Sequence, residues 1–226
     1  FMNILIIGTG NCGITYAADL VKKGHNITLL KSSIGGCDSK IKYIVDNNNI
    51  VSLIENDCRV DSKIQKITNS YDDAFKNNHD VIIICSQTNY HEDIILNIKK
   101  FIRGSDIVLL EPGYASTAFF LKHGIECTIV EAQSSPIDCR VNDMGEALVL
   151  FRNVRNPVGI FSKFDHEEIK KILNSLDYNF FYLDSVVEAA LHNPNLIVHT
   201  IGAIMSIPRI EYTNGEYWMY KEVFTP

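Results

Sequence analysis

Residues 3–13 read NILIIGTGNCG, and this stretch decides the fold of the chain. The run from Asn3 to Ile7 is almost continuously apolar, which is typical of a parallel strand buried on both faces. The glycine loop Gly8-Thr9-Gly10-Asn11-Cys12-Gly13 follows directly and matches the pattern G-x-G-x-x-G. Beyond it, apolar residues from Ile14 to Val21 recur at helical spacing. A strand, a glycine loop and a helix in this order predict the first unit of a dinucleotide-binding Rossmann domain.

The glycines of this loop have separate purposes. The first permits a tight turn, the second lets the backbone approach a pyrophosphate, and the third lets helix and strand pack closely. The N-terminus of the following helix adds free N–H groups and a partial positive charge. We therefore assign five loop residues to the cofactor: Gly8, Gly10, Asn11, Cys12 and Gly13.

The end of the second predicted strand, Ile27 to Leu30, indicates which dinucleotide is bound. NAD enzymes usually place Asp or Glu about twenty residues after the loop, where the carboxylate binds the ribose 2′-hydroxyl. Here the sequence is Lys31-Ser32-Ser33. A lysine beside hydroxyl groups favours a 2′-phosphate. We expect NADPH to be preferred over NADH, with Lys31 and Ser32 or Ser33 on the phosphate, and Ser86 along the same crevice.

The remaining sequence up to Leu183 alternates strands and helices, which predicts an α/β fold with a doubly wound parallel sheet. Ser70-Tyr71-Asp72-Asp73 is a capping box that starts a short helix. Strands are also expected at 81–85, 106–110 and 127–130, and helices at 91–101, before Gly124 and at 166–176. Two short strands, 41–45 and 50–54, are expected in an irregular stretch. Strands 139–141, 147–151 and 158–161, with no helices between them, predict an antiparallel extension.

From residue 184 onward the pattern is mostly helical, so we expect residues 1–183 and 184–226 to be two domains. Asn193 suits a helix N-cap and Pro194 the first turn. Asn195 and His199, four residues apart, then share one face, and His192 precedes the cap. A histidine with a pKa near neutrality can supply the proton that hydride reduction of a carbonyl or imine needs. On spacing alone, the apolar residues around His199 favour a buried structural histidine over a catalytic one.

Composition narrows the class of protein. A net charge of −6 disfavours nucleic-acid binding, which normally needs a basic face. Apolar runs such as Val81 to Cys85 are too short to span a membrane, and no signal peptide is expected. The six cysteines are scattered without a C-x-x-C pair, which indicates reduced thiols in a cytoplasmic protein. No metal site is expected, because His192 and His199 have no carboxylate or cysteine at ligand spacing.

Several segments together resemble the octopine/nopaline (opine) dehydrogenase family, over nearly the whole chain. The most specific likenesses are the block from Glu131 to Arg140 and the region around His199. The others are the glycine loop, Ser86 to His91, Glu111-Pro112-Gly113-Tyr114, and His192-Asn193-Pro194-Asn195.

The resemblance implies an activity. Members of this family use NAD(P)H to reduce the imine formed between an amino acid and a 2-keto acid such as pyruvate. It also implies that His199 is the catalytic acid/base beside the nicotinamide. Asn195, on the same helix face, is expected to orient either the substrate or the imidazole ring, and we assign Asn195 and His192 to the substrate. The family's helical domain is longer than residues 184–226, so we expect only its start here, and poor turnover by this polypeptide alone.

Two other readings stay open. Ketopantoate-reductase-like and glycerol-3-phosphate-dehydrogenase-like enzymes share the layout but use a helical-domain lysine, and Lys221 alone follows Lys171. A non-enzymatic alternative is a sensor that binds the nucleotide without catalysing a reaction. Tyr217, Trp218 and Tyr220 fit either a homodimer interface or an unfinished helical core.

Overall fold

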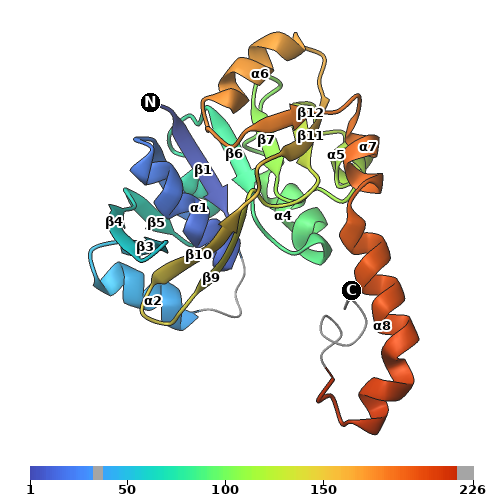
Figure 1. Cartoon of the computed structure of the whole chain (residues 1–226). Helices are drawn as coiled ribbons and strands as arrows, with labels where there is room; N and C mark the ends of the chain where they lie inside the picture. The colour runs from blue at the N-terminus through green and yellow to red at the C-terminus, as the bar shows by residue number, and fades with distance from the viewer. Residues whose placement is uncertain (33–37, 218–226) are drawn as a thin grey trace. The chain divides into compact units, whose positions relative to one another are not determined.

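The structure is a computed structural model that describes residues 1–32 and 38–217 (Figure 1). Contacts divide the chain into two compact units, residues 1–191 and 192–226, and each is described by itself. The first unit is built on an eight-stranded sheet with the order β12-β11-β8-β7-β6-β1-β2-β5. Its strands are β1 (Asn3–Ile7), β2 (Asn26–Leu30), β5 (Lys66–Thr68), β6 (Val81–Ile84), β7 (Ile107–Leu110), β8 (Thr128–Ala132), β11 (Asn156–Phe161) and β12 (Phe180–Tyr182).

The alternation of side chains along β1 explains how the sheet is covered on both faces. Ile4 and Ile6 point into one core, whereas Leu5 and Ile7 point into the other, and all four are fully buried. The first core is completed by α1 (Asn11–Lys22), α6 (His166–Asn174) and a second sheet. The second core is completed by α3 (Tyr71–Ala74), α4 (His91–Ile98) and α5 (Thr117–Lys122). The predicted doubly wound α/β fold is therefore confirmed.

The antiparallel part of the fold is divided between two sheets. Strand β11 pairs antiparallel with β8 and extends the main sheet as predicted, and β12 then pairs parallel with β11. The other strands form a separate sheet, β4-β3-β10-β9, which packs on α1. Its members are β3 (Ile50–Glu55), β4 (Cys58–Lys63), β9 (Ile137–Val141) and β10 (Glu146–Arg152). The pairing of β3 with β10 joins segments far apart in the sequence, which local patterns do not reveal.

The prediction of a strand at residues 41–45 is wrong. These residues belong to helix α2 (Asp38–Asp46). Ile41 and Ile44 are buried at a helical spacing of three, while Val45 is 46% exposed. In a strand, Ile41 and Ile44 would point to opposite faces, so one of them would leave the core.

A buried charge network fixes α1 against the second sheet. Asp19 of α1 is 1% exposed and accepts hydrogen bonds from Arg152 Nη2 at 2.7 Å and the Tyr178 hydroxyl at 2.9 Å. Lys23 Nζ lies 3.3 Å from the same carboxylate, and Arg152 also binds Glu55. Burial acts to raise the pKa of Asp19, but Arg152 and Lys23 outweigh it and lower the pKa. The network therefore orients the helix that carries the glycine loop at its N-terminus.

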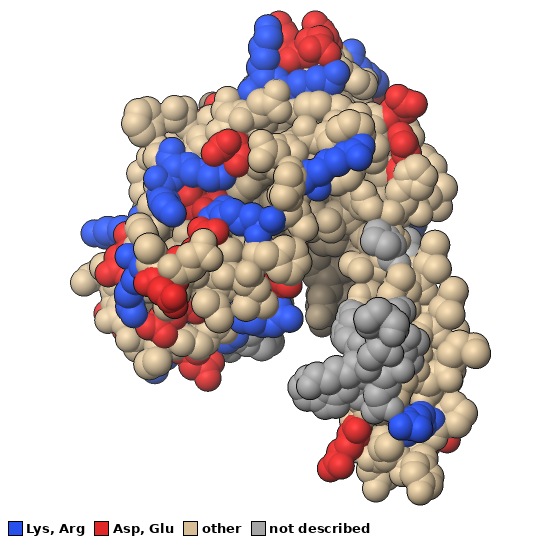
Figure 2. All heavy atoms as spheres, in the orientation of Figure 1, with Lys and Arg blue, Asp and Glu red and all other residues tan. Residues whose placement is uncertain are grey.

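The second unit contains α8 (Pro194–Tyr212), which begins as predicted. The side chain of its N-cap, Asn193, accepts from the backbone N–H of Asn195 at 2.9 Å. Among the described residues, no helix combines the length and the apolar character needed to cross a bilayer. Figure 2 shows Lys and Arg interspersed with Asp and Glu over the first unit, the usual arrangement on a globular surface.

Candidate cofactor site

The glycine loop has the geometry that its sequence predicts. Gly8 has a φ of 122°, and a Cβ there would collide with the carbonyl oxygen of Cys85. A Cβ at Gly13 would collide with the carbonyl oxygen of Gly8. At Gly10, in contrast, an added Cβ would meet no described atom within 4 Å. Gly8 and Gly13 are therefore required by the protein's own packing, while the space beside Gly10 is open for a ligand.

The first turn of α1 is suited to an anion. Gly10 is the N-cap, and this turn carries no acidic side chain. The N–H groups at the start of a helix have no partner within the helix, and the helix dipole favours negative charge there. A cradle of backbone N–H groups beside an open space fits the pyrophosphate of a dinucleotide.

A lysine that the sequence analysis missed lies beside this loop. Lys40 Nζ donates to the carbonyl oxygen of Val141 at 2.5 Å and to Asn11 Oδ1 at 3.4 Å. Asn11 Oδ1 also accepts from the backbone N–H of Val141 at 3.1 Å, so this side chain ties β9 and α2 to the loop. Lys40 directly precedes residues 41–45, which were wrongly predicted to form a strand. It lies in helix α2, and this helix positions Lys40 beside the glycine loop.

An open cleft of about 1320 Å³ runs along the carboxyl ends of the central strands. Of the predicted cofactor residues, the cleft is lined by Gly8, Gly10, Asn11, Cys12, Ser32 and Ser86; Lys40, Glu111, Pro112 and Tyr114 also line it. Lys31 is half-buried, and its backbone N–H donates to the Thr68 carbonyl oxygen at 2.9 Å, but it does not line the cleft. Ser33 lies outside the described residues.

A buried acid lies at this cleft. Glu111 is 1% exposed, and neither of its carboxyl oxygens has a hydrogen-bond partner among the described residues. Burial, followed by the electrostatic effect of Cys12, raises the pKa of Glu111 well above its usual range. Tyr16 is also fully buried, and burial and Glu111 raise its pKa. Burial without a hydrogen-bond partner in the described part of the chain therefore favours the protonated form of the Glu111 carboxyl group.

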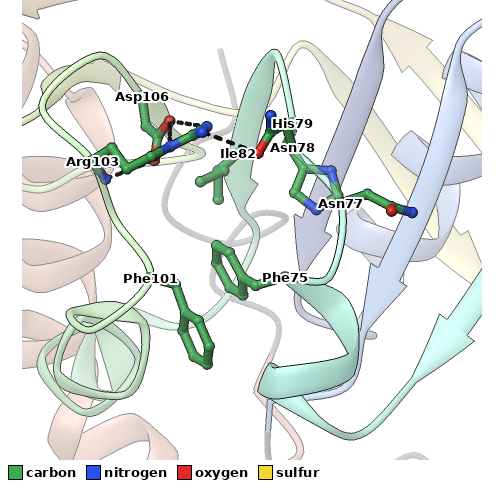
Figure 3. A pocket seen from close by; sticks show the side chains of 8 residues that line it. All are labelled: Phe75, Asn77, Asn78, His79, Ile82, Phe101, Arg103 and Asp106. Carbon is green, nitrogen blue, oxygen red and sulfur yellow. Dashed lines mark hydrogen bonds and ion pairs between the residues drawn. The ribbon is translucent and has the colours of Figure 1, made fainter.

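A second, smaller pocket of about 100 Å³ lies at the amino ends of β6 and β7, whereas the cleft lies at their carboxyl ends (Figure 3). Phe75 and Phe101 stack there at 4.6 Å between ring centroids. The guanidinium of Arg103 is held by Asp106 at 2.8 Å and by Asn78 Oδ1 at 3.0 Å. These contacts close one end of the domain and lie far along the strands from the glycine loop.

Comparison with known proteins now bears on the family. Residues 182–226 match the family model described as NAD/NADP octopine/nopaline dehydrogenase, alpha-helical domain, and residues 4–123 match ketopantoate reductase PanE/ApbA. Residues 4–123 are more than half of the chain, which therefore belongs to the PanE/ApbA family. The resemblance to the opine dehydrogenase family is confirmed by the helical-domain match and by the curated relative below.

One curated relative and two solved structures are similar to most of this chain. The chain is 24% identical to an opine dehydrogenase of Arthrobacter sp. (strain 1C) over 98% of this chain and 61% of that protein. Octopine dehydrogenase with NADH and L-arginine has a TM-score of 0.72 at 14% identity, over 96% of this chain and 56% of that one. NADP+-bound yersinopine dehydrogenase has a TM-score of 0.70 at 13% identity, over 89% and 52%. The chain thus spans about three fifths of the curated relative.

The remaining predicted site residues lie in the second unit. Asn195 is exposed and His199 is half-buried on α8, and His192 is exposed just before it. Their roles remain predictions. The domain boundary near Leu183 also remains a prediction, because two observations about it differ. The helical-domain match begins at residue 182, whereas helix α7 (Val186–Leu191) packs on β11 and β8 of the first unit.

Proposed function

We propose that this protein is an NAD(P)H-dependent oxidoreductase of the opine dehydrogenase family. The observation that carries the proposal is the glycine loop, in which Gly8 and Gly13 are closed by the protein's own backbone while Gly10 opens onto the cleft. The N-terminus of α1 would hold the pyrophosphate, and the cofactor would supply a hydride. NADH and NADP+ in the octopine and yersinopine dehydrogenase structures support a nicotinamide cofactor.

NADPH is proposed as the preferred cofactor, with NADH second. Ser32 follows β2, the strand beside β1, and lines the cleft. The sequence has no carboxylate at the position after this strand that NAD enzymes use for the ribose. Lys31 is adjacent to Ser32, and Lys40 adds a cation to the lining of the same cleft. We assign the 2′-phosphate to Ser32 with one of these two lysines.

A thermal shift titration with NADPH and NADH tests the cofactor and separates the two lysines. Ligand at a hundred times its Kd adds about 2.7 kcal/mol to the free energy of unfolding, so a real site gives a clear increase in Tm. We expect a larger shift with NADPH. Lys40→Ala is expected to weaken NADPH binding about tenfold, because one charge-assisted hydrogen bond is lost. Lys31→Ala is the matched control. A larger loss of NADPH affinity in Lys31→Ala than in Lys40→Ala would assign the 2′-phosphate to Lys31. No shift with either dinucleotide would contradict the function.

The proposed reaction reduces the imine of an amino acid and a 2-keto acid. L-Arginine and pyruvate in octopine dehydrogenase structures support this substrate class. His199 would donate the proton that reaches the imine nitrogen as the carbon receives hydride, with Asn195 and His192 orienting the substrate. A cytoplasmic location and a homodimer are proposed with it.

The observation that favours a ketopantoate-reductase-like reaction instead is the match over residues 4–123. Consumption of NADPH with pyruvate and a panel of amino acids decides between the two. We expect His199→Ala to lower kcat about a hundredfold or more, the usual contribution of a general acid, with NADPH binding unchanged. His166→Ala, an exposed histidine at the start of α6, is the control. Full activity in His199→Ala would favour chemistry that uses a lysine.

A further inference from the structure

Two loops form the wall of the cleft on the side away from Ser32. Loop A, residues 85–90, follows β6, and loop B, residues 111–116, follows β7. The cleft is lined by Ser86, Gln87 and Thr88 from loop A and by Glu111, Pro112 and Tyr114 from loop B. In the sheet order, β6 and β7 lie on one side of β1, and β2 lies on the other. A dinucleotide with its adenosine end at β2 and its pyrophosphate at β1 therefore places its nicotinamide half against loops A and B.

The imidazole of His91 connects these loops from behind the wall. His91 is the first residue of α4 and is fully buried. Its Nε2 lies 3.1 Å from the carbonyl oxygen of Ser86, and its Nδ1 lies 2.7 Å from Ser116 Oγ. A carbonyl oxygen only accepts, so Nε2 carries the hydrogen. Burial lowers the pKa of His91, so the ring is neutral, and Nδ1 then accepts from the Ser116 hydroxyl.

Loop B is also held from its other side. The buried Glu131 of β8 accepts from the backbone N–H of Ala115 at 2.8 Å and of Thr117 at 2.6 Å. Tyr114 and Ala115 have φ values of 51° and 65°, a conformation that costs about 1–3 kcal/mol per residue unless the surroundings enforce it. Hydrogen bonds thus run from Glu131 through loop B and His91 to loop A.

The Ser116–His91 pair has the hydrogen bond of a nucleophile and its base, but Ser116 is fully buried, so its oxygen has no access to a substrate in the cleft. We propose instead that His91 is a positioning residue for the nicotinamide half of the dinucleotide. Its two hydrogen bonds set the spacing between loop A and loop B, and hence the shape of the wall that this half contacts. The inference rests on the proposed function, since it assumes that a dinucleotide occupies the cleft.

Three variants remove the two connections separately. His91→Gln can still donate to the Ser86 carbonyl oxygen but loses the acceptor for Ser116. His91→Asn can still accept from Ser116 but loses the donor for Ser86. Ser116→Ala removes only the buried hydroxyl that binds His91 behind the wall. The probes are NADPH and 2′-phospho-ADP-ribose, which lacks only the nicotinamide ring, with Kd measured by calorimetry and Tm measured alongside.

We expect each variant to weaken NADPH binding about tenfold, the effect of one lost buried hydrogen bond. Binding of 2′-phospho-ADP-ribose is expected to stay within about twofold, because the contacts at β1 and β2 are untouched. Equal losses for both probes would show that His91 acts only in folding and would overturn the inference, as would unchanged NADPH binding. If the unmodified protein binds neither probe, the proposed function fails as well.

Discussion

Gly13→Ala is expected to lower the free energy of unfolding by about 3 kcal/mol, the upper end of the usual cost of forcing extra volume into a packed site. The added Cβ would meet the carbonyl oxygen and carbon of Gly8, which are backbone atoms that no rotamer change can move aside. The loop would have to shift, so binding of the dinucleotide should be lost with stability. For a domain of this size we expect Tm to fall by about 6–12 °C, measured by circular dichroism.

Gly10→Ala is the matched control, because the same change at the second glycine meets no described atom within 4 Å. Its Tm without ligand should stay within about 2 °C of the unmodified protein, as for a surface substitution. Binding of NADPH should nevertheless be lost, since the methyl group occupies the space through which the pyrophosphate approaches. Two variants with equal Tm losses, or a Gly10→Ala variant that binds NADPH normally, would contradict this division of roles.

Glu111→Gln is expected to stabilise the protein, and increasingly so as the pH rises. The folded pKa of Glu111 is raised well above 4.5, so folding above pH 4.5 takes up a proton. The unmodified protein is then most stable below pH 4.5, and its stability falls by about 1.4 kcal/mol per pH unit until the folded pKa is reached. Glutamine needs no proton, so the stability of the variant relative to the unmodified protein should increase as the pH rises above 4.5.

Urea unfolding of the two proteins between pH 5 and 8 measures this difference. Glu126→Gln is the control, because that side chain is 74% exposed and its stability difference should not vary with pH. A stability difference for Glu111→Gln that stays constant across this range would show that Glu111 is ionised in the folded protein.

The glycine loop and β1 could be predicted from the sequence because their signals are local. Five adjacent residues specify a buried strand, and three glycines at fixed spacing specify the turn. The helix at 38–46 was missed because its short apolar pattern allows either element, and burial of Ile41 and Ile44 decided for the helix. Because this helix was missed, Lys40 was not predicted to lie near the glycine loop.

By itself, the sequence determined the α/β class, the position of the glycine loop and the N-cap of α8, because each depends on residues within a few positions of one another. Only the tertiary structure decided which side chains meet across the sheet. Asn11 joins Val141, Asp19 joins Arg152 and His91 joins Ser116 through pairings of distant segments. These contacts form only when the strands are arranged in the right order. Local spacing in the sequence does not encode that order, because it follows from burial of the whole sheet.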